Sequence, residues 1–259
     1  MYEFNYKRPS TLDEAAALLN EDTVLLAGGQ TLLPTLKQRL AQPEALVDLS
    51  AIESLRGVCP DGDQLAIGSM TTHAEVAAKA TIPALASLAK GIGDAQVRNR
   101  GTIGGSIANN DPAADYPAAV VGLNAVITTN KRAIAGDDFF TDLFETVLEE
   151  GEIITNVTFP QPDAAAYMKF DNPASRYAIV GVMVAKTSNG IRVAITGAGP
   201  CVFRQTEMEA ALSSNFSTQS IENINVSADG LNSDLHASAE YRANLIKVLA
   251  KRAVAQIDG

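Results

Sequence analysis

The sequence predicts an α+β protein in which two mixed α/β units are followed by a smaller α+β unit. Short apolar strands alternate with amphipathic helices, and two glycine-rich turns lie about seventy residues apart. With 259 residues, of which 46% are hydrophobic, the chain can form a substantial core and more than one domain. We place the three units at residues 1–55, 56–163 and 164–259.

The first unit is expected to be a small β-α-β arrangement. A capping box over residues 11–14 starts a short helix, and a buried strand at residues 23–27 runs into the first glycine-rich turn. A helix at residues 32–40 and a buried strand at residues 45–49 complete the unit.

The other two units continue the alternation. In the second, the expected elements are a strand at 64–68, a helix that opens with a capping box at 72–75, helices at 83–95 and 116–123, a strand at 125–129, and closing segments at 136–140 and 151–160. After a linker at 160–166, the expected elements are paired strands at 178–186 and 190–197 and helices at 207–212 and 240–257.

The glycine-rich turns are the most informative feature. Residues 26–34 read LAGGQTLLP, and residues 102–115 read TIGGSIANNDPAAD. Glycine allows a positive φ and a close approach of a ligand to the backbone. Successive N–H groups in such turns form concave anion sites, so two turns with hydroxyl and amide neighbours predict one diphosphate held from both sides.

Two common nucleotide sites are excluded. Neither turn contains the G-x-x-x-x-G-K-S/T pattern of a P-loop, and neither places G-x-G-x-x-G between a strand and a helix. The pair of turns instead resembles the FAD-binding subunit of the molybdenum hydroxylases, such as the medium subunit of carbon monoxide dehydrogenase, and more distantly the FAD domain of xanthine dehydrogenase.

The motifs that carry this resemblance are long. The family has AGG(H/Q)(S/T)LLP in its first turn and RNxGTIGG(N/S)(I/L)A in its second, followed by DPA(A/S)D. Residues 97–108 of this chain read VRNRGTIGGSIA, and the similarity continues through residues 175–182 and 240–242. The resemblance implies a PCMH-type, vanillyl-alcohol-oxidase-like fold. In it, FAD lies between subdomains 1–55 and 56–163, and residues 164–259 form a C-terminal domain like that of the carbon monoxide dehydrogenase flavoprotein.

The resemblance also assigns residues to the cofactor. The backbone N–H groups of the first turn would surround the pyrophosphate, and the side chains of Gln30 and Thr31 would add donors. The residues of this turn are Ala27, Gly28, Gly29, Gln30, Thr31, Leu32 and Leu33. The second would form the opposite wall through Thr102, Ile103, Gly104, Gly105, Ser106 and Asn109. The alternative for the first turn is an ordinary strand-to-helix turn that needs glycine.

Four further residues have two possible roles each. Asp115 would bond a ribose hydroxyl or a backbone N–H, or it would cap the helix at 116–123. Ile153 and Ile154 match apolar flavin contacts, or they are strand core. Lys169 matches a lysine at the pyrimidine end of the flavin, where a cation stabilises the charge that reduction adds, or it is a solvated surface lysine.

The remaining reactive side chains are few. The sequence has two cysteines and two histidines, so His/Cys metal sites and four-cysteine iron–sulfur ligation are not expected in this chain. We expect His73 and His236 to be structural, and Arg98 and Arg100 to be solvated, to orient the loop or to face a partner. Because Gln30 replaces the histidine of some relatives, we expect FAD to be bound non-covalently.

The overall composition excludes other classes. The net charge of −10 argues against nucleic-acid binding. No stretch approaches eighteen apolar residues and the N-terminus lacks a signal-peptide core, so we expect no membrane span and a cytoplasmic location.

The resemblance implies an electron-transfer subunit with no catalytic side chain. Its partners would be a large molybdenum-cofactor subunit and a small subunit with 2Fe–2S clusters, in a dimer of heterotrimers, and an external acceptor would take the electrons. Carbon monoxide, a purine, an aldehyde or an N-heterocycle would be oxidised on the large subunit. The alternatives are a stand-alone flavin reductase or oxidase of the same fold and a scaffold without FAD.

Overall fold

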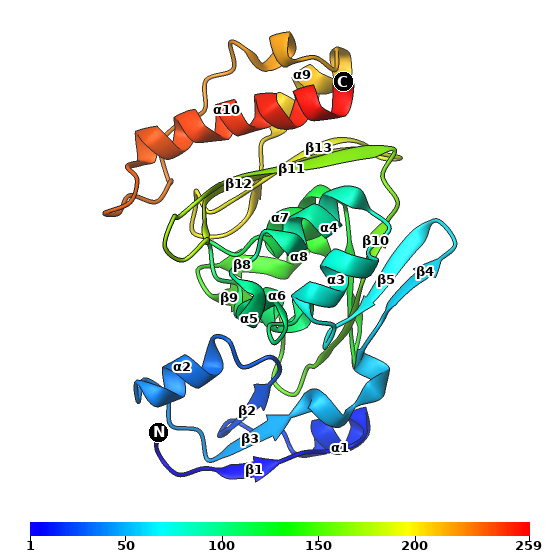
Figure 1. Ribbon diagram of the computed structural model, residues 1–259, viewed down its shortest axis with the longest axis vertical. Coiled ribbons are helices and arrows are strands. Elements are labelled where there is room, and N and C mark those ends of the chain that lie inside the picture. Colours follow the sequence, from blue (N-terminus) through cyan, green and yellow to red (C-terminus); the bar gives the residue numbers. More distant parts are fainter.

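The computed structural model describes all 259 residues, arranged as three units stacked along the long axis (Figure 1). The N-terminal unit has a three-stranded sheet in the order β1-β3-β2. Its elements are β1 (Asn5–Lys7), α1 (Leu12–Ala17), β2 (Thr23–Leu26), α2 (Leu32–Lys37) and β3 (Ala45–Asp48). Strands β2 and β3 pair in parallel, with Val24 opposite Leu46, so the predicted β-α-β arrangement is present.

Two short 3₁₀ turns, η1 (Leu49–Ala51) and η2 (Glu53–Leu55), lead into the central unit. Its five-stranded antiparallel sheet has the order β4-β5-β10-β6-β7. The strands are β4 (Val58–Asp61), β5 (Gln64–Gly68), β6 (Val126–Thr129), β7 (Ala133–Ala135) and β10 (Ile154–Pro160), and a separate hairpin is formed by β8 (Phe140–Asp142) and β9 (Glu145–Thr146).

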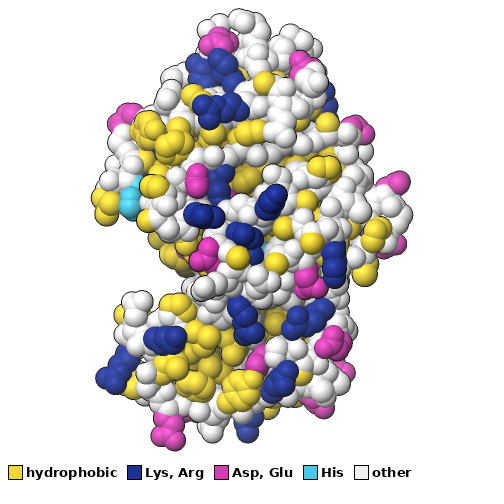
Figure 2. Space-filling model, viewed as in Figure 1, with side chains coloured by type: hydrophobic (Ala, Val, Ile, Leu, Met, Phe, Trp, Pro, Cys, Tyr) yellow, Lys and Arg dark blue, Asp and Glu magenta, His cyan; other side chains and the backbone are white.

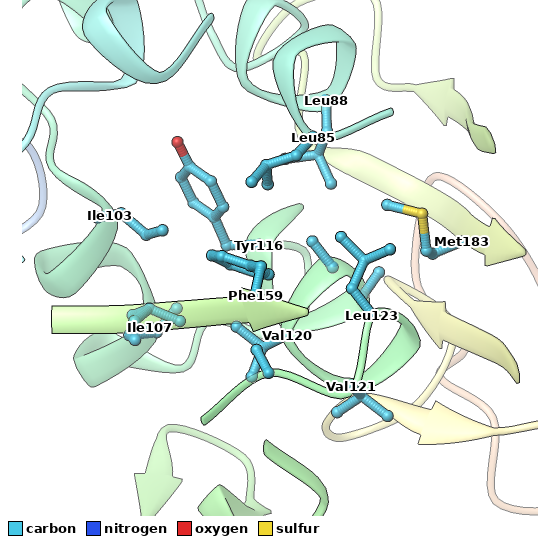
Figure 3. Packing of buried hydrophobic residues seen from close by; sticks show 14 of the residues in the cluster. Leu85, Leu88, Ile103, Ile107, Tyr116, Val120, Val121, Leu123, Phe159 and Met183 are labelled. Carbon is cyan, nitrogen blue, oxygen red and sulfur yellow. The ribbon is translucent and has the colours of Figure 1, made fainter. Parts of the chain in front are cut away.

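The central unit also contains six helices: α3 (His73–Lys79), α4 (Pro83–Lys90), α5 (Ala95–Arg98), α6 (Ile103–Asn109), α7 (Tyr116–Gly122) and α8 (Gly136–Phe139). Every residue of α7 is buried, because this helix lies in the middle of the largest hydrophobic cluster. Figure 3 shows the Tyr116 ring among Leu85, Phe159 and their neighbours, with its hydroxyl pointing away from them.

The C-terminal unit has a four-stranded antiparallel sheet in the order β11-β12-β13-β14, comprising β11 (Ala164–Asp171), β12 (Ala178–Thr187), β13 (Gly190–Thr196) and β14 (Phe203–Arg204). One face packs on α7 through Met183, and the other carries α9 (Thr206–Ser214), η3 (Thr218–Ile221) and α10 (Ala239–Asp258). The first eight residues of β12 are buried because both faces of this sheet are covered.

Several predicted boundaries differ from the structure. The helix expected at 83–95 ends at Lys90, because Gly93 takes a positive φ of 47° and Asp94 caps a new helix. The helix expected at 32–40 ends at Lys37, before Arg39 at a φ of 60°. The linker expected at 160–166 is shorter, since β10 ends at Pro160 and β11 begins at Ala164.

The two predicted capping boxes also differ from each other. At Thr72 and Glu75 both reciprocal contacts form. At Thr11 only half of the box is present: its hydroxyl accepts from the Glu14 N–H, but the Glu14 carboxylate bonds the Ser10 N–H at 2.9 Å instead.

Candidate functional site

A cavity of about 880 Å³ lies where the three units meet. It is bounded by the two glycine-rich turns, by residues 148–154 and by residues 175–177 of the C-terminal unit. Figure 2 shows the molecule narrowing between the N-terminal unit and the rest. A cavity of this size and position between units is typical of a cofactor site.

The first glycine-rich turn offers open hydrogen-bond donors to this cavity. The backbone N–H groups of residues 27–31 donate to no acceptor within the chain. Gly29 takes a positive φ of 73° directly after β2, and the side chains of Gln30 and Thr31 are exposed. Consecutive unpaired N–H groups of this kind form a nest for an anion, such as a diphosphate.

The second turn lines the same cavity, but the N–H groups of its glycine pair are already used. The Gly104 N–H donates to the Ser69 carbonyl at 2.9 Å, and the Gly105 N–H donates to the Thr102 hydroxyl at 3.2 Å. The free groups on this side are the side chains of Ser106 and Asn109, which bond to no other group of the chain. The backbone nest is therefore on one side of the cavity, and the second turn contributes side chains.

The two turns touch each other. A Cβ atom on Gly28 would lie 2.1 Å from the carbonyl oxygen of Arg100, two residues before the second turn, and one on Gly105 would lie 3.3 Å from the Ala27 Cβ. The second turn also packs on Ser69, which directly follows β5: a Cβ atom on Gly104 would lie 2.5 Å from the Ser69 Cβ and 2.8 Å from the Ser69 carbonyl oxygen. These glycines are needed because backbone packs directly on backbone. The first turn therefore needs glycine for packing, as the alternative of an ordinary strand-to-helix turn expected, and the same turn also carries the unpaired N–H groups.

Leu33 and Ile103 do not line the cavity. The Leu33 side chain packs beside Gly29, and Ile103 is fully buried in the central hydrophobic cluster. Both residues pack behind the turns, and a contact of either with the cofactor stays a prediction.

Asp115 lines the cavity and is held by two side chains of the C-terminal unit. Its carboxylate accepts from the Tyr167 hydroxyl at 2.6 Å and lies 3.1 Å from Lys169 Nζ. Asp115 occupies the N-cap position of α7, as the helix-cap alternative expected, but its side chain makes no capping hydrogen bond there. Burial raises the pKa of Asp115, and the charge of Lys169 opposes that rise.

Lys169 lies beside Asp115, with its ammonium 3.1 Å from the carboxylate. Its ammonium also donates to the carbonyls of Gly91 and Arg176, both at 2.9 Å. The side chain is only 11% exposed, so the alternative of a solvated surface lysine is wrong. Lys169 is not among the residues that line the cavity, and a direct flavin contact remains a prediction.

Ile153 and Ile154 fit both of their expected roles. They are 1% and 6% exposed, and they pack into two different hydrophobic clusters. Both also line the cavity, where they form an apolar wall. A planar aromatic ligand would find its apolar contact there.

Two polar residues of the wall, Ser69 and His73, carry no sign of this position in the sequence. Ser69 and His73 are 3% and 5% exposed, and the Ser69 Oγ and His73 Nδ1 atoms have no hydrogen-bond partner. Burial lowers the pKa of His73 to about 4, so its ring is neutral at pH 7. The capping box placed His73 in a first helical turn, but no local signal showed that this helix packs against the second glycine-rich turn.

Other expected residues play structural roles. Arg98 donates to the carbonyls of Ile92 and Gly93 at 2.9 and 2.8 Å, and so fixes the break between α4 and α5. Arg100 is exposed. The structure contains no cluster of three or more His, Cys, Asp or Glu side chains that could hold a metal ion, and no helix in it is long and apolar enough to cross a membrane.

These residues fit FAD. The nest supplies donors for a diphosphate, Ser106 and Asn109 supply polar side chains opposite it, and the isoleucine wall supplies an apolar surface for a ring.

Comparison with known families agrees with this fit. Residues 2–162 match the model described as the FAD-binding domain in molybdopterin dehydrogenase, and residues 165–257 match the carbon monoxide dehydrogenase flavoprotein C-terminal domain. The chain belongs to this family of FAD-binding dehydrogenase subunits.

Individual members of the family are similar over their full length. The carbon monoxide dehydrogenase medium chain of Hydrogenophaga pseudoflava is 34% identical, with 97% of this chain and 96% of the relative covered. The nicotine 6-hydroxylase medium subunit of Paenarthrobacter nicotinovorans is 33% identical, with 97% and 96% covered. The solved Cu,Mo-CO dehydrogenase gives a TM-score of 0.91 at 31% identity, with 98% of this chain and 97% of that chain covered. The expected fold class is thus confirmed.

Proposed function

We propose that this chain is the FAD-binding electron-transfer subunit of a molybdenum hydroxylase complex. A large partner subunit would hold the molybdenum cofactor and oxidise the substrate, and a small partner subunit would carry the 2Fe–2S clusters. The complex would be a cytoplasmic dimer of heterotrimers. Membership of the family and the names of the relatives, which include medium chains and FAD subunits of several dehydrogenases, support this proposal.

One observation in the chain itself supports the proposal most strongly. The unpaired N–H groups of residues 27–31 and the apolar pair Ile153–Ile154 line one cavity, although they come from different units. A diphosphate linked to an aromatic ring system requires both features. We place the division between the two FAD-binding subdomains at residues 55 and 56, and the C-terminal domain at residues 164–259.

FAD, when bound, supplies chemistry that links electron donors and acceptors. The work of the chain's own residues is binding and orientation. The nest neutralises diphosphate charge with backbone dipoles, and the isoleucine wall keeps water from one part of the cavity. Asp115 stays fixed by Tyr167 and Lys169, so the cavity keeps its shape without a ligand.

Three titratable side chains of the wall are held by the chain itself and are not free to transfer a proton to a small substrate. His73 is neutral and packed on Gly101, and the buried carboxylates of Asp115 and Glu152 are already held by Lys169 and Arg132. These contacts favour a subunit that exchanges electrons over a stand-alone oxidase, which needs an acid or base beside the flavin. Non-covalent binding is proposed because the exposed Gln30 has no nucleophilic side chain.

Omission of this chain from the complex tests the function. Complexes assembled with and without it would be mixed with the substrate of the large subunit, and both the cluster absorbance and the reduction of an external acceptor dye would be recorded. The proposal expects cluster reduction in both samples and transfer to the acceptor only when this chain is present. Rapid oxidation of a small substrate by the isolated chain would support the stand-alone enzyme instead.

A further inference from the structure

A buried charged network holds the apolar wall of the cavity in place. Glu152 precedes the isoleucine pair, and its side chain is fully buried. Each carboxylate oxygen accepts two hydrogen bonds. Oε1 accepts from the Thr129 hydroxyl at 2.8 Å and from Arg132 Nε at 2.9 Å. Oε2 accepts from Arg132 Nη2 at 3.0 Å and from the Glu149 N–H at 2.8 Å. A carboxylate with four donors has no freedom to change its orientation.

The turn at residues 129–132 also bonds the same segment at other points along its length. Arg132 Nη2 donates to the Val147 carbonyl at 2.7 Å. The Asn130 side-chain oxygen accepts from the Ile153 N–H at 2.8 Å, and the backbone N–H of Asn130 donates to the Ile153 carbonyl at 2.9 Å. Segment 147–153 is therefore attached on both sides of Gly151, whose φ of 70° reverses the chain.

The charge state of the network is stable around neutral pH. The guanidinium of Arg132 lowers the pKa of Glu152 to about 2, with help from the Glu149 N–H and the Thr129 hydroxyl. Arg132 reaches Glu152 from the surface with 40% of its side chain exposed. Glu152 is therefore the member of the pair that has lost its contact with water. A glutamine at this position could not accept hydrogen bonds from all four donors that surround the carboxylate.

We infer that Glu152 and Arg132 are positioning residues that hold Ile153 and Ile154 against the ring system of FAD. This inference rests on the proposed FAD site. The network touches none of the open N–H groups of residues 27–31, which belong to another unit. Loss of the network should therefore weaken the ring end of the site and leave the diphosphate end intact.

The chain contains a matched control at Glu209. Its carboxylate is also held by an arginine fork and a backbone N–H: Arg204 Nε at 2.9 Å, Arg204 Nη2 at 2.6 Å and the Val193 N–H at 2.9 Å. Glu209 is 7% exposed, and it does not line the cavity. A Glu209→Gln variant therefore shows what the loss of such a pair does to stability alone.

The test compares FAD with ADP, which has the adenosine and diphosphate but no flavin ring. Dissociation constants of both would be measured by calorimetry on the full-length apoprotein of the wild type, Glu152→Gln and Glu209→Gln. Loss of one buried hydrogen-bond partner weakens binding about tenfold. Glu152→Gln should therefore raise the dissociation constant of FAD by about that factor and leave the dissociation constant of ADP unchanged. Glu209→Gln should change neither constant.

Other outcomes would contradict the inference. Unchanged FAD binding by Glu152→Gln would show that the network is only structural, and equal weakening of FAD and ADP would show that it supports the whole cavity. Wild-type chain that binds no FAD would overturn the proposed function itself. If Glu152→Gln does not fold, Arg132→Lys provides the comparison, because it keeps the charge but not the fork, and the same FAD-selective loss is required of it.

Discussion

At the scale of single residues, the site depends on glycines that bring two backbones together. Gly28 lies against Arg100 and Gly101 with no room for a methyl group, and the N–H groups that follow it stay unpaired. The sequence predicted this turn because the pattern of glycine with hydroxyl and amide side chains is specific. It could not show that Gly104 packs on Ser69, because those residues are 35 positions apart in the chain (104 minus 69).

Gly28→Ala should abolish FAD binding while the fold is retained. Its Cβ would meet the Arg100 carbonyl oxygen at 2.1 Å, so the two turns must separate and the nest must change shape. Binding would be followed by flavin fluorescence and folding by circular dichroism. Gly62→Ala is the control. Gly62 lies in the hairpin between β4 and β5, and no atom lies within 4 Å of an added Cβ. An alanine is strained there only by the positive φ of 58°, so this variant shows the effect of losing a glycine outside the cavity. FAD binding by Gly28→Ala with wild-type affinity would mean that the nest does not hold the cofactor.

His73 should make the stability of the apoprotein sensitive to acid. Burial lowers its folded pKa from 6.5 to about 4, so the unfolded chain binds the extra proton more readily. The stabilisation is fully present above pH 6.5 and is lost as the pH falls towards 4, by up to roughly 3 kcal/mol. Urea unfolding at several pH values would measure it. His73→Phe should flatten the profile between pH 6.5 and 4, and an equally steep profile in this variant would assign the effect to another group.

At the scale of elements, the buried group around Asp115 joins the start of α7 to β11. Tyr167 and Lys169 are two residues apart on one strand, so both side chains point to the same face and meet one carboxylate. The sequence predicted that Asp115 and Lys169 matter, each for a separate contact with the cofactor. It did not pair them, because a strand and a helix 54 positions apart give no local sign of contact.

Asp115→Asn should destabilise the protein by about 3 kcal/mol at pH 7, since it leaves the buried ammonium of Lys169 without its partner. Lys169→Met should lower the stability by a similar amount, because it leaves the buried carboxylate of Asp115 without its cation. The double variant should cost less than the sum, because neither charge is then left unpaired. Denaturant unfolding of the four proteins gives the coupling energy, and strictly additive losses would show that the pair is not coupled.

The elements themselves were predicted unevenly. Strands β12 and β13 are recognisable because a continuous apolar run is interrupted by Ser188-Asn189-Gly190, and the 20-residue α10 has clear periodicity. The break at Gly91–Gly93 was missed because the apolar pattern continues across it. The segment 213–238 has little regular structure beyond η3, which agrees with its polar sequence.

At the scale of the whole molecule, the cavity exists only because three units meet. The N-terminal unit supplies the nest, the central unit supplies the isoleucine wall and the second turn, and the C-terminal unit closes the edge with residues 175–177. The family resemblance predicted a site between the first two units, but not its closure by residues 175–177. Composition and periodicity alone predicted neither, since they place no unit relative to another. We expect this shared cavity to hold FAD.

The most direct test is the stoichiometry and identity of the flavin that the purified chain binds. The chain would be saturated with FAD, freed of excess by gel filtration, precipitated with acid, and the released chromophore identified by chromatography. The account predicts one FAD per chain, released completely by acid. No flavin uptake by well-folded protein would contradict it and would leave the two glycine-rich turns as structural features alone.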